Sequence, residues 1–281
     1  CSNNLSRTCR SNNGNITTCA SIVTVEDLGP FIFCQDATVF LDASGATQIT
    51  SSDVDAGSHD PGGIQSFAVA PDSFSCAEIG VNSVVLTVTA NSGNVKTCSA
   101  NVTVSDTTSP NALCQNLTVY LDGNGSAFIT AQDVGSATTD NCQIQALTID
   151  IDSFGCGNVG NNAVILTASD PSANISTCQA QVVVEDTTLP VVSCVDITLQ
   201  LDAIGTSLLS PDDIDGGNSD NCGVASLAVS QASFDCADVG TTIVTLTATD
   251  DHENSSDCTS AVTIEDVCLL YTSPSPRDEK V

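Results

Sequence analysis

The cysteines of this chain recur with a period of 80 residues, which constrains the fold more than any other feature. A fixed period of this length indicates one folding unit copied in tandem. The columns are Cys34, Cys114 and Cys194; Cys76, Cys156 and Cys236; Cys98, Cys178 and Cys258; and Cys142 and Cys222. We therefore expect an array of small units rather than a single large globule.

The same period predicts how the chain divides. Residues 13–27 match residues 91–106 with one residue deleted, so the first stretch resembles the end of a preceding, truncated repeat. The last residues leave the pattern altogether, and we expect them to be artefactual or disordered. The expected segments are a remnant over 1–29, repeats over 30–109, 110–189 and 190–267, and the tail over 268–281.

Within one repeat, apolar and polar residues alternate over short runs. Leu117, Val119 and Leu121 alternate with polar side chains, and similar runs follow at 127–130, 144–151, 164–168 and 180–184. Period two predicts strands with one buried face, and the sequence contains no helical period. The pattern predicts an all-β fold, namely tandem immunoglobulin-like antiparallel β-sandwiches in an elongated array. Short linkers that end in Pro110 and Pro190 predict a stiff rod.

Each repeat is poor in large core residues, because the whole chain has no Trp or Met, eight Phe and two Tyr. Fifteen cysteines offer cross-links that compensate for a small core. Regularly spaced cysteines without a Cys-x-x-Cys pair favour disulfides formed in an oxidising compartment. They disfavour zinc, which normally needs close ligand pairs.

The charge is strongly negative, with 34 acidic residues against 5 basic ones and a net charge of −29. Between residues 20 and 267 the only basic residue other than histidine is Lys96. Such a surface repels nucleic acid and anionic membranes. No stretch approaches the ~20 apolar residues of a membrane span, so no membrane insertion is expected. Either many carboxylates bind divalent cations, or the surface is acidic and solvated, and both can hold.

Aspartates recur in register with the cysteines. Calcium binds six to eight oxygens from carboxylates, carbonyls and amides. Aspartates from loops and linkers at one end of a sandwich can converge to supply them, which makes Ca²⁺ the candidate cofactor. The alternative is that these aspartates cap turns and strand ends. The candidates are Asp106, Asp186 and Asp266 in the linkers, Asp140 and Asp220 before a cysteine, and Asp170 and Asp250 in the last loop.

No arrangement for catalysis is apparent. His59 and His252 do not share a column, and no Gly-x-Ser-x-Gly is present, so we expect no enzyme activity from this segment.

One phenylalanine column precedes the second cysteine column, and it is either a core anchor or a platform for stacking glycans. Its members are Phe74, Phe154 and Phe234.

Three features resemble the HYR (hyalin repeat) family, in a bacterial surface-protein variant. They are Cys114 with its following strand, the Val159-Gly160 turn, and the ending that runs through Cys178. The resemblance covers residues 30–266. It implies an extracellular β-sandwich involved in adhesion, with no catalytic residues to carry over.

The resemblance also implies a disulfide scheme, since the first-strand and last-strand cysteines of that family pair. The implied bonds are Cys34–Cys98, Cys114–Cys178 and Cys194–Cys258. The remaining cysteines would then pair locally, as Cys142–Cys156 and Cys222–Cys236. Gly62 replaces the local partner of Cys76, which leaves Cys76 as a buried free thiol or in an intermolecular bond.

These observations favour a secreted or surface-anchored structural region, extracellular or on a bacterial cell surface. A stalk or fibre needs length rather than chemical variety, and near-identical repeats supply it. The expected partners are neighbouring repeats, other protein chains or surface glycans. One alternative is a carbohydrate- or ligand-binding module, which the scarcity of Tyr and Trp disfavours. Another is a set of accessory domains of a large exported enzyme.

Overall fold

The computed structural model describes residues 2–24, 26 and 28–266. It contains two compact units, and the second repeat contributes to both. Unit 1 is Cys1–Asn111, Thr139–Gln145 and Ser169–Ile175, and unit 2 is Ala112–Thr138, Ala146–Ala168 and Ser176–Val281. Two loops of the second repeat, 139–145 and 169–175, therefore pack as part of unit 1. The tail over 268–281 lies outside the described residues, as do Cys1 and Cys268.

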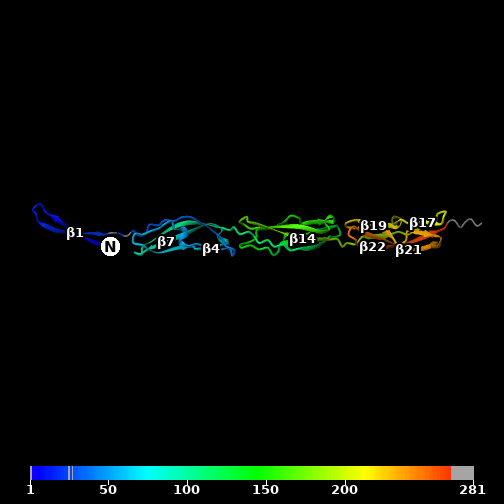
Figure 1. Cartoon of the computed structure of the whole chain (residues 1–281), viewed down its shortest axis with the longest axis horizontal. Helices are drawn as coiled ribbons and strands as arrows, with labels where there is room; N and C mark the ends of the chain where they lie inside the picture. The colour runs from blue at the N-terminus through cyan, green and yellow to red at the C-terminus, as the bar shows by residue number, and fades with distance from the viewer. Residues whose placement is uncertain (1, 25, 27, 267–281) are drawn as a thin grey trace, which may run out of the picture. The chain divides into compact units, whose positions relative to one another are not determined.

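The first described segment is an antiparallel hairpin of β1 (Ser2–Arg10) and β2 (Ile16–Thr24), in which Arg10 pairs with Ile16. Three repeats of β-strands then follow (Figure 1). Each also has a one-turn α-helix and a 3₁₀ turn, and the third has two further strands, β15 and β18. The first repeat contains β3 (Ala37–Phe40), β4 (Ala46–Gln48), α1 (Ser51–Val54), β5 (Ile64–Ala70), β6 (Ser73–Ser75), η1 (Cys76–Glu78), β7 (Gly80–Ala90) and β8 (Val95–Ser105). The second contains β9 (Leu117–Tyr120), β10 (Ser126–Phe128), α2 (Ala131–Gly135), β11 (Ala146–Ile149), β12 (Ser153–Gly155), η2 (Cys156–Asn158), β13 (Gly160–Ser169) and β14 (Ile175–Glu185). The third contains β15 (Val191–Cys194), β16 (Ile197–Gln200), β17 (Thr206–Leu208), α3 (Pro211–Ile214), β18 (Asp215–Ser219), β19 (Val224–Val229), β20 (Ser233–Asp235), η3 (Cys236–Asp238), β21 (Gly240–Asp250) and β22 (Ser255–Glu265).

Each repeat is a β-sandwich with a four-stranded sheet, which confirms the predicted fold class. In the first repeat the order of this sheet is β3-β8-β7-β5, and β4 pairs with β6 in a small second sheet. Most neighbouring strands are antiparallel, but β3 runs parallel to β8, with Val39 opposite Val104. The parallel pair brings the first and last strands of a repeat together, where a disulfide joins them.

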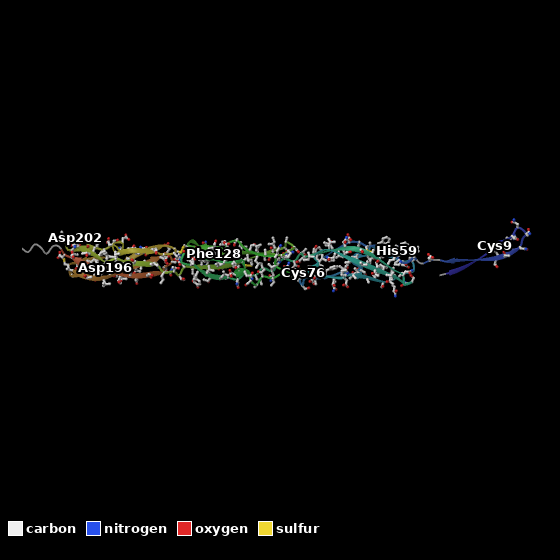
Figure 2. All side chains as sticks on the ribbon, turned by 180° about the vertical axis from the view of Figure 1, so that it is seen from behind. Cys9, His59, Cys76, Phe128, Asp196 and Asp202 are labelled. Carbon is white, nitrogen blue, oxygen red and sulfur yellow. A yellow bond between two sulfur atoms is a disulfide. The ribbon has the colours of Figure 1, made fainter. Side chains whose placement is uncertain are left out.

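Alternation along the long strands places one face of each in a core. In β7 the buried residues are Val84, Leu86, Val88 and Ala90, with none of their surface exposed. The phenylalanine column is buried too, with Phe74, Phe154 and Phe234 only 4%, 3% and 2% exposed. The core-anchor interpretation is therefore confirmed over the glycan platform. By contrast, the nearby side chain of Phe128 is 74% exposed (Figure 2).

The short helices are the main element that the sequence pattern missed. In α2, Thr130 and Asp133 form a capping box, in which Thr130 N–H donates to Asp133 Oδ2 over 2.7 Å. A single turn is too short to show a helical period in its apolar residues, so only the cap chemistry could have signalled it. Among the described residues, no helix has the length and apolar character needed to cross a bilayer.

The five disulfides of the three repeats follow two patterns. Within repeats, the structure contains the three bonds that the resemblance implied, with Cα–Cα distances of 5.7 to 6.1 Å: Cys34–Cys98, Cys114–Cys178 and Cys194–Cys258. Between repeats, Cys76 is bonded to Cys142 and Cys156 to Cys222, each across 66 residues. Cys236 has an exposed free thiol.

The expected local bonds Cys142–Cys156 and Cys222–Cys236 are therefore wrong, and so is the expectation that Cys76 lacks an intramolecular partner. Strand β11 lies between Cys142 and Cys156, and a β-strand extends by ~3.3 Å with each residue. A disulfide requires Cα atoms within about 7 Å. Proximity in sequence was misleading, since Cys142 lies in unit 1 and Cys156 in unit 2.

Candidate metal centres

Six of the seven candidate aspartates come together in two clusters. In each cluster one carboxylate comes from a linker, one from the loop before a bridging cysteine, and one from the turn between the last two strands. Within a cluster, the potential ligand atoms all lie within 4.8 Å of one another. The first triad is Asp106, Asp140 and Asp170, in unit 1, and the second triad is Asp186, Asp220 and Asp250, in unit 2. Asp266 belongs to neither.

Backbone amides orient each carboxylate of the first triad. Asp106 Oδ1 accepts a hydrogen bond from Thr108 N–H over 3.0 Å, just after the end of β8. Asp140 Oδ2 accepts one from Cys142 N–H over 2.9 Å. Asp170 Oδ1 accepts one from Asn174 N–H over 2.8 Å, in the turn between β13 and β14. These are local Asx-type turns, so the sequence around each aspartate sets where its carboxylate points.

The remaining oxygens meet in a buried space. Asp106 Oδ2 and Asp140 Oδ1 are inaccessible to solvent and have no hydrogen-bond partner. Asp106 is 6% exposed and Asp170 fully buried. Three ionised carboxylates at this separation would repel one another by about 3.5 kcal/mol per pair at an effective dielectric constant of 20. Among the described residues, no lysine or arginine forms an ion pair with the triad.

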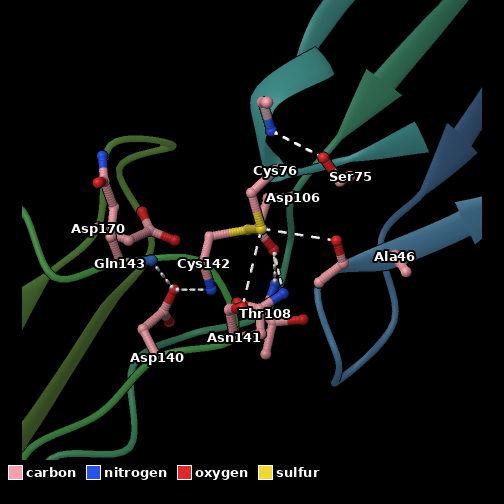
Figure 3. The surroundings of a disulfide bond; sticks show 12 residues. Ala46, Ser75, Cys76, Asp106, Thr108, Asp140, Asn141, Cys142, Gln143 and Asp170 are labelled. Carbon is pink, nitrogen blue, oxygen red and sulfur yellow. Dashed lines mark hydrogen bonds between the residues drawn. A yellow bond between two sulfur atoms is a disulfide. The ribbon is translucent and has the colours of Figure 1, made fainter.

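Asn141 completes this cluster, although the sequence analysis did not single it out. Its Nδ2 donates to the backbone oxygen of Asp42 over 3.1 Å and to Asp106 Oδ1 over 3.2 Å (Figure 3). Its Oδ1 is buried without a partner, and so offers one further oxygen. Asn221 makes the equivalent bonds to Asp122 and Asp186 in unit 2. The Asp-Asn-Cys triplet shared by the second and third repeats was the available signal.

The disulfide lies directly beside the first triad and requires a glycine. Cys142 follows Asn141, and Cys76 Sγ lies 3.7 Å from the Asn141 carbonyl oxygen (Figure 3). Gly45 approaches so closely that a Cβ there would lie 2.7 Å from both Cys76 Sγ and that oxygen, and its φ is +74°. Gly125 has the same role beside Cys156 and Asn221.

The second triad repeats this arrangement with one difference. Asp186 Oδ1 accepts from Thr188 N–H over 3.1 Å, and Asp220 Oδ2 accepts from Cys222 N–H over 2.8 Å. Burial disfavours the charged form of Asp250, but hydrogen bonds from Asn254 and the backbone of His252 outweigh this and lower its pKa. The difference is the His252 side chain, whose Nδ1 lies 3.2 Å from Asp186 Oδ2.

Other aspartate columns serve turns, as the alternative interpretation predicted. Asp42 Oδ1 accepts hydrogen bonds from the hydroxyl and N–H of Ser44 and from Ala46 N–H. These bonds, the Ser44 hydroxyl first, hold the pKa of Asp42 below its ordinary value. Asp122 and Asp202 make similar turns in the other repeats. The acidic columns therefore divide between turn chemistry and two clusters.

Comparisons with solved structures find similar multi-domain proteins at low identity. The fragment PcdhgB3 EC1-4 is 13% identical, with a TM-score of 0.35, over 95% of this chain and 82% of that one. The titin I-band fragment I67-I69 is 11% identical, with a TM-score of 0.36, over 84% and 99%. Sidekick-1 immunoglobulin domains 1-5 are 11% identical, with a TM-score of 0.34, over 92% and 66%. No curated protein sequence matches the chain.

A family model gives the more specific result, because residues 185–264 match the HYR domain. This stretch begins at the end of β14 and includes nearly all of the third repeat. Together with the disulfide framework, the match indicates an extracellular or cell-surface protein. The match confirms, over residues 185–264, the HYR resemblance that the cysteine columns and strand pattern first indicated.

Proposed function

We propose that this chain is a non-catalytic, tension-bearing repeat region of an extracellular structural or adhesive protein. The observation that carries the proposal is that its disulfides interleave along the sequence. The loop closed by each bond overlaps the loop closed by the next, from Cys34 to Cys258. The bonds in order are Cys34–Cys98, Cys76–Cys142, Cys114–Cys178, Cys156–Cys222 and Cys194–Cys258.

Interleaving gives consecutive repeats two covalent connections. One is the peptide linker, such as 99–113, and the other is the bond that joins Cys76 to Cys142. Each bond across 66 residues also restricts the unfolded chain, by about 4 kcal/mol in the loop-entropy model. A spacer under tension benefits from both effects. Neither cleavage of one linker nor unfolding of one repeat adds much to the length of the chain.

The bonds limit how far the chain can extend even when it is unfolded. Between Cys34 and Cys258, the shortest covalent path passes through three bridges and two linkers, from Cys98 to Cys114 and from Cys178 to Cys194. At ~3.5 Å per residue that path measures about 130 Å, whereas the reduced chain between the same residues measures about 800 Å. Little extensibility is what a stalk or fibre needs.

Single-molecule force spectroscopy tests this directly. With the full chain held at its two ends, we expect the segment between Cys34 and Cys258 to add no more than about 130 Å of contour under oxidising conditions. Addition of a disulfide reductant should release several hundred ångströms more. Unfolding steps of that larger size without reductant would contradict the proposal.

Divalent cations are the second part of the proposal. Each triad has three converging carboxylates and an asparagine amide oxygen, and the first triad offers oxygen donors only. Oxygen donors of this kind suit Ca²⁺. A Ca²⁺ ion at the first triad would offset the carboxylate repulsion and hold Asp106 of one repeat against Asp140 and Asp170 of the next.

Calorimetric titration of the full chain with CaCl₂ checks the calcium assignment. We expect Asp106→Asn to remove one calcium-binding event from the titration. The control is Asp152→Asn, at an exposed position outside both triads, which should bind calcium as the wild type does. Calcium at 100 times its Kd should stabilise the wild type by about 2.7 kcal/mol. Absence of both heat and stabilisation would remove calcium from the proposal and leave the disulfide argument intact.

One surface favours a second candidate function, the binding of glycans. Phe31 and Phe33 are 52% and 49% exposed, and both rings stack with His59, at centroid distances of 5.2 and 6.1 Å. Exposed, rigid aromatic rings can stack on the apolar faces of sugars. A glycan array probed with the wild type and with the Phe31→Ser, Phe33→Ser double variant tests it. If the wild type and the double variant bind the same glycans with equal signal, Phe31 and Phe33 do not form a glycan-binding surface.

A further inference from the structure

The two triads differ chemically at one position of the turn between the last two strands. In the second repeat this position is Ser172, and in the third it is His252. The turn itself is the same, because Ala173 and Glu253 both have positive φ angles, of 66° and 69°. The chain therefore contains an all-oxygen cluster and a cluster to which an imidazole has been added.

His252 is held against the second triad by its own backbone. Its N–H donates to Asp250 Oδ1 over 2.8 Å, which fixes the residue beside a triad carboxylate. Its Nδ1 then lies 3.2 Å from Asp186 Oδ2, with the side chain of Asp186 fully buried and that of His252 19% exposed. The imidazole nitrogen and the carboxylate oxygen thus face one buried space.

The contact between these two atoms is not a hydrogen bond. Although they are 3.2 Å apart, Nδ1 and Oδ2 each lack a hydrogen-bond partner. A metal ion bound by both atoms would give each the partner that it lacks. Two ligands of one tetrahedral metal ion, with bonds of ~2.05 Å, lie about 3.3 Å apart.

The donor set indicates which class of ion fits. Imidazole is a ligand for zinc and other first-row transition metals, whereas Ca²⁺ and Mg²⁺ take oxygen. Cys222 Sγ also lies within the cluster, but it is bonded to Cys156 and offers no thiolate. Asp220 Oδ1, buried and without a partner, supplies a further oxygen.

We infer that the second triad with His252 is a site for a first-row transition-metal ion of the Zn²⁺ class, bound by His252, Asp186 and Asp220 or Asp250. This goes against the sequence-based expectation on zinc, which considered only the spacing of cysteines. The inference deepens the proposed cation binding, but it is tested separately from calcium.

The test exchanges the two residues. After free thiols are blocked with iodoacetamide, the full chain is titrated with ZnCl₂ by calorimetry. We expect one zinc ion per wild-type chain, binding at least tenfold weaker in His252→Ser, and two ions in Ser172→His. His59→Gln changes the only other histidine and should leave the titration unchanged. With Cu²⁺ as the probe, electron paramagnetic resonance should show nitrogen coupling that disappears in His252→Ser.

The outcomes separate this inference from the proposed function. Zinc binding that is equal in the wild type and in His252→Ser would overturn the inference, and so would the absence of zinc binding. Either result leaves calcium at the first triad untouched. Zinc binding that depends on His252, with no calcium binding at all, would support the inference and remove calcium from the proposed function.

Discussion

Asp186 lies in the linker before the third repeat and Asn221 lies 35 residues later, in a loop of that repeat, yet the amide nitrogen of Asn221 donates to Asp186 Oδ1 over 3.1 Å. The same amide nitrogen donates to the backbone oxygen of Asp122 over 3.0 Å, in the second repeat. One side chain of the third repeat therefore contacts the turn of the second repeat and the linker between them. Cys222, the next residue, adds the covalent bond to Cys156.

The second covalent connection predicts the result of cutting a linker. If a specific protease site is inserted after Thr188, the cleaved chain should migrate as one species on a non-reducing denaturing gel, because Cys156–Cys222 still joins the pieces. Reduction should separate them. The control is the Cys156→Ser, Cys222→Ser double variant, which should separate without reductant. Two bands from the cleaved wild type before reduction would contradict the disulfide assignment.

Gly125 should tolerate substitution far less than its neighbour Gly123. A Cβ at Gly125 would lie 2.8 Å from both the Asn221 oxygen and Cys156 Sγ, and the φ of +73° disfavours any other residue. Gly123 has open space around it. We expect Gly125→Ala to lower the free energy of unfolding by about 1–3 kcal/mol and Gly123→Ala by less than about 1 kcal/mol, measured by urea denaturation. Equal effects would argue against the close packing at this turn.

Asp122 should contribute stability that depends on pH. Backbone N–H groups, that of Ser126 first and then that of Asn124, hold its pKa below 3.8 in the folded state. A lowered pKa means that the stabilisation is complete above the unfolded-state pKa, near 4, and is lost as pH falls through the folded-state value. Asp122→Asn should therefore destabilise the chain at pH 6, with a deficit that shrinks below about pH 4 in urea titrations.

Asp202→Asn provides an independent replicate in the third repeat, because Asp202 also accepts backbone hydrogen bonds that lower its pKa. The same dependence on pH is expected there. A deficit that stays constant from pH 6 to pH 2 in both variants would show that the carboxylate charge is not involved.

Cys236 should react where the cysteines of the same column do not. Its thiol is free and exposed, whereas Cys76 and Cys156 are bonded to cysteines of the following repeats. Iodoacetamide added to the folded, non-reduced protein should modify the peptide that contains Cys236. Peptides that contain Cys76 or Cys156 should be modified only after reduction, as mass spectrometry can measure. Modification of Cys156 before reduction would contradict the bond to Cys222.

The cysteine count fits local bonds and bonds between repeats equally well. Local pairing leaves Cys76 unpaired in the first full repeat, since Gly62 replaces its partner. Pairing each repeat with the next uses Cys76 and leaves Cys236, in the third repeat, as the unpaired member of the column. Both schemes leave one cysteine over, so sequence alone did not decide between them. The choice depends on which loops the folded strands place together.

Much of this protein is determined by local patterns in the sequence. Alternation of apolar residues specifies the long strands, as in Val84, Leu86 and Val88, because period two buries one face of any such strand. The cysteine period specifies the tandem repeats, and the phenylalanine column specifies a core position. Asx turns orient Asp106, Asp140 and Asp170 by contacts within a few residues.

Only the tertiary structure decided what these local elements meet. The convergence of three aspartates, the bond between Cys76 and Cys142, and the approach of His252 to Asp186 all join segments distant in sequence. Such contacts depend on the packing of one repeat's loops against the preceding linker, which no periodicity in the sequence encodes. The sequence by itself therefore determines the units and their cores, whereas tertiary packing determines their covalent and ionic connections.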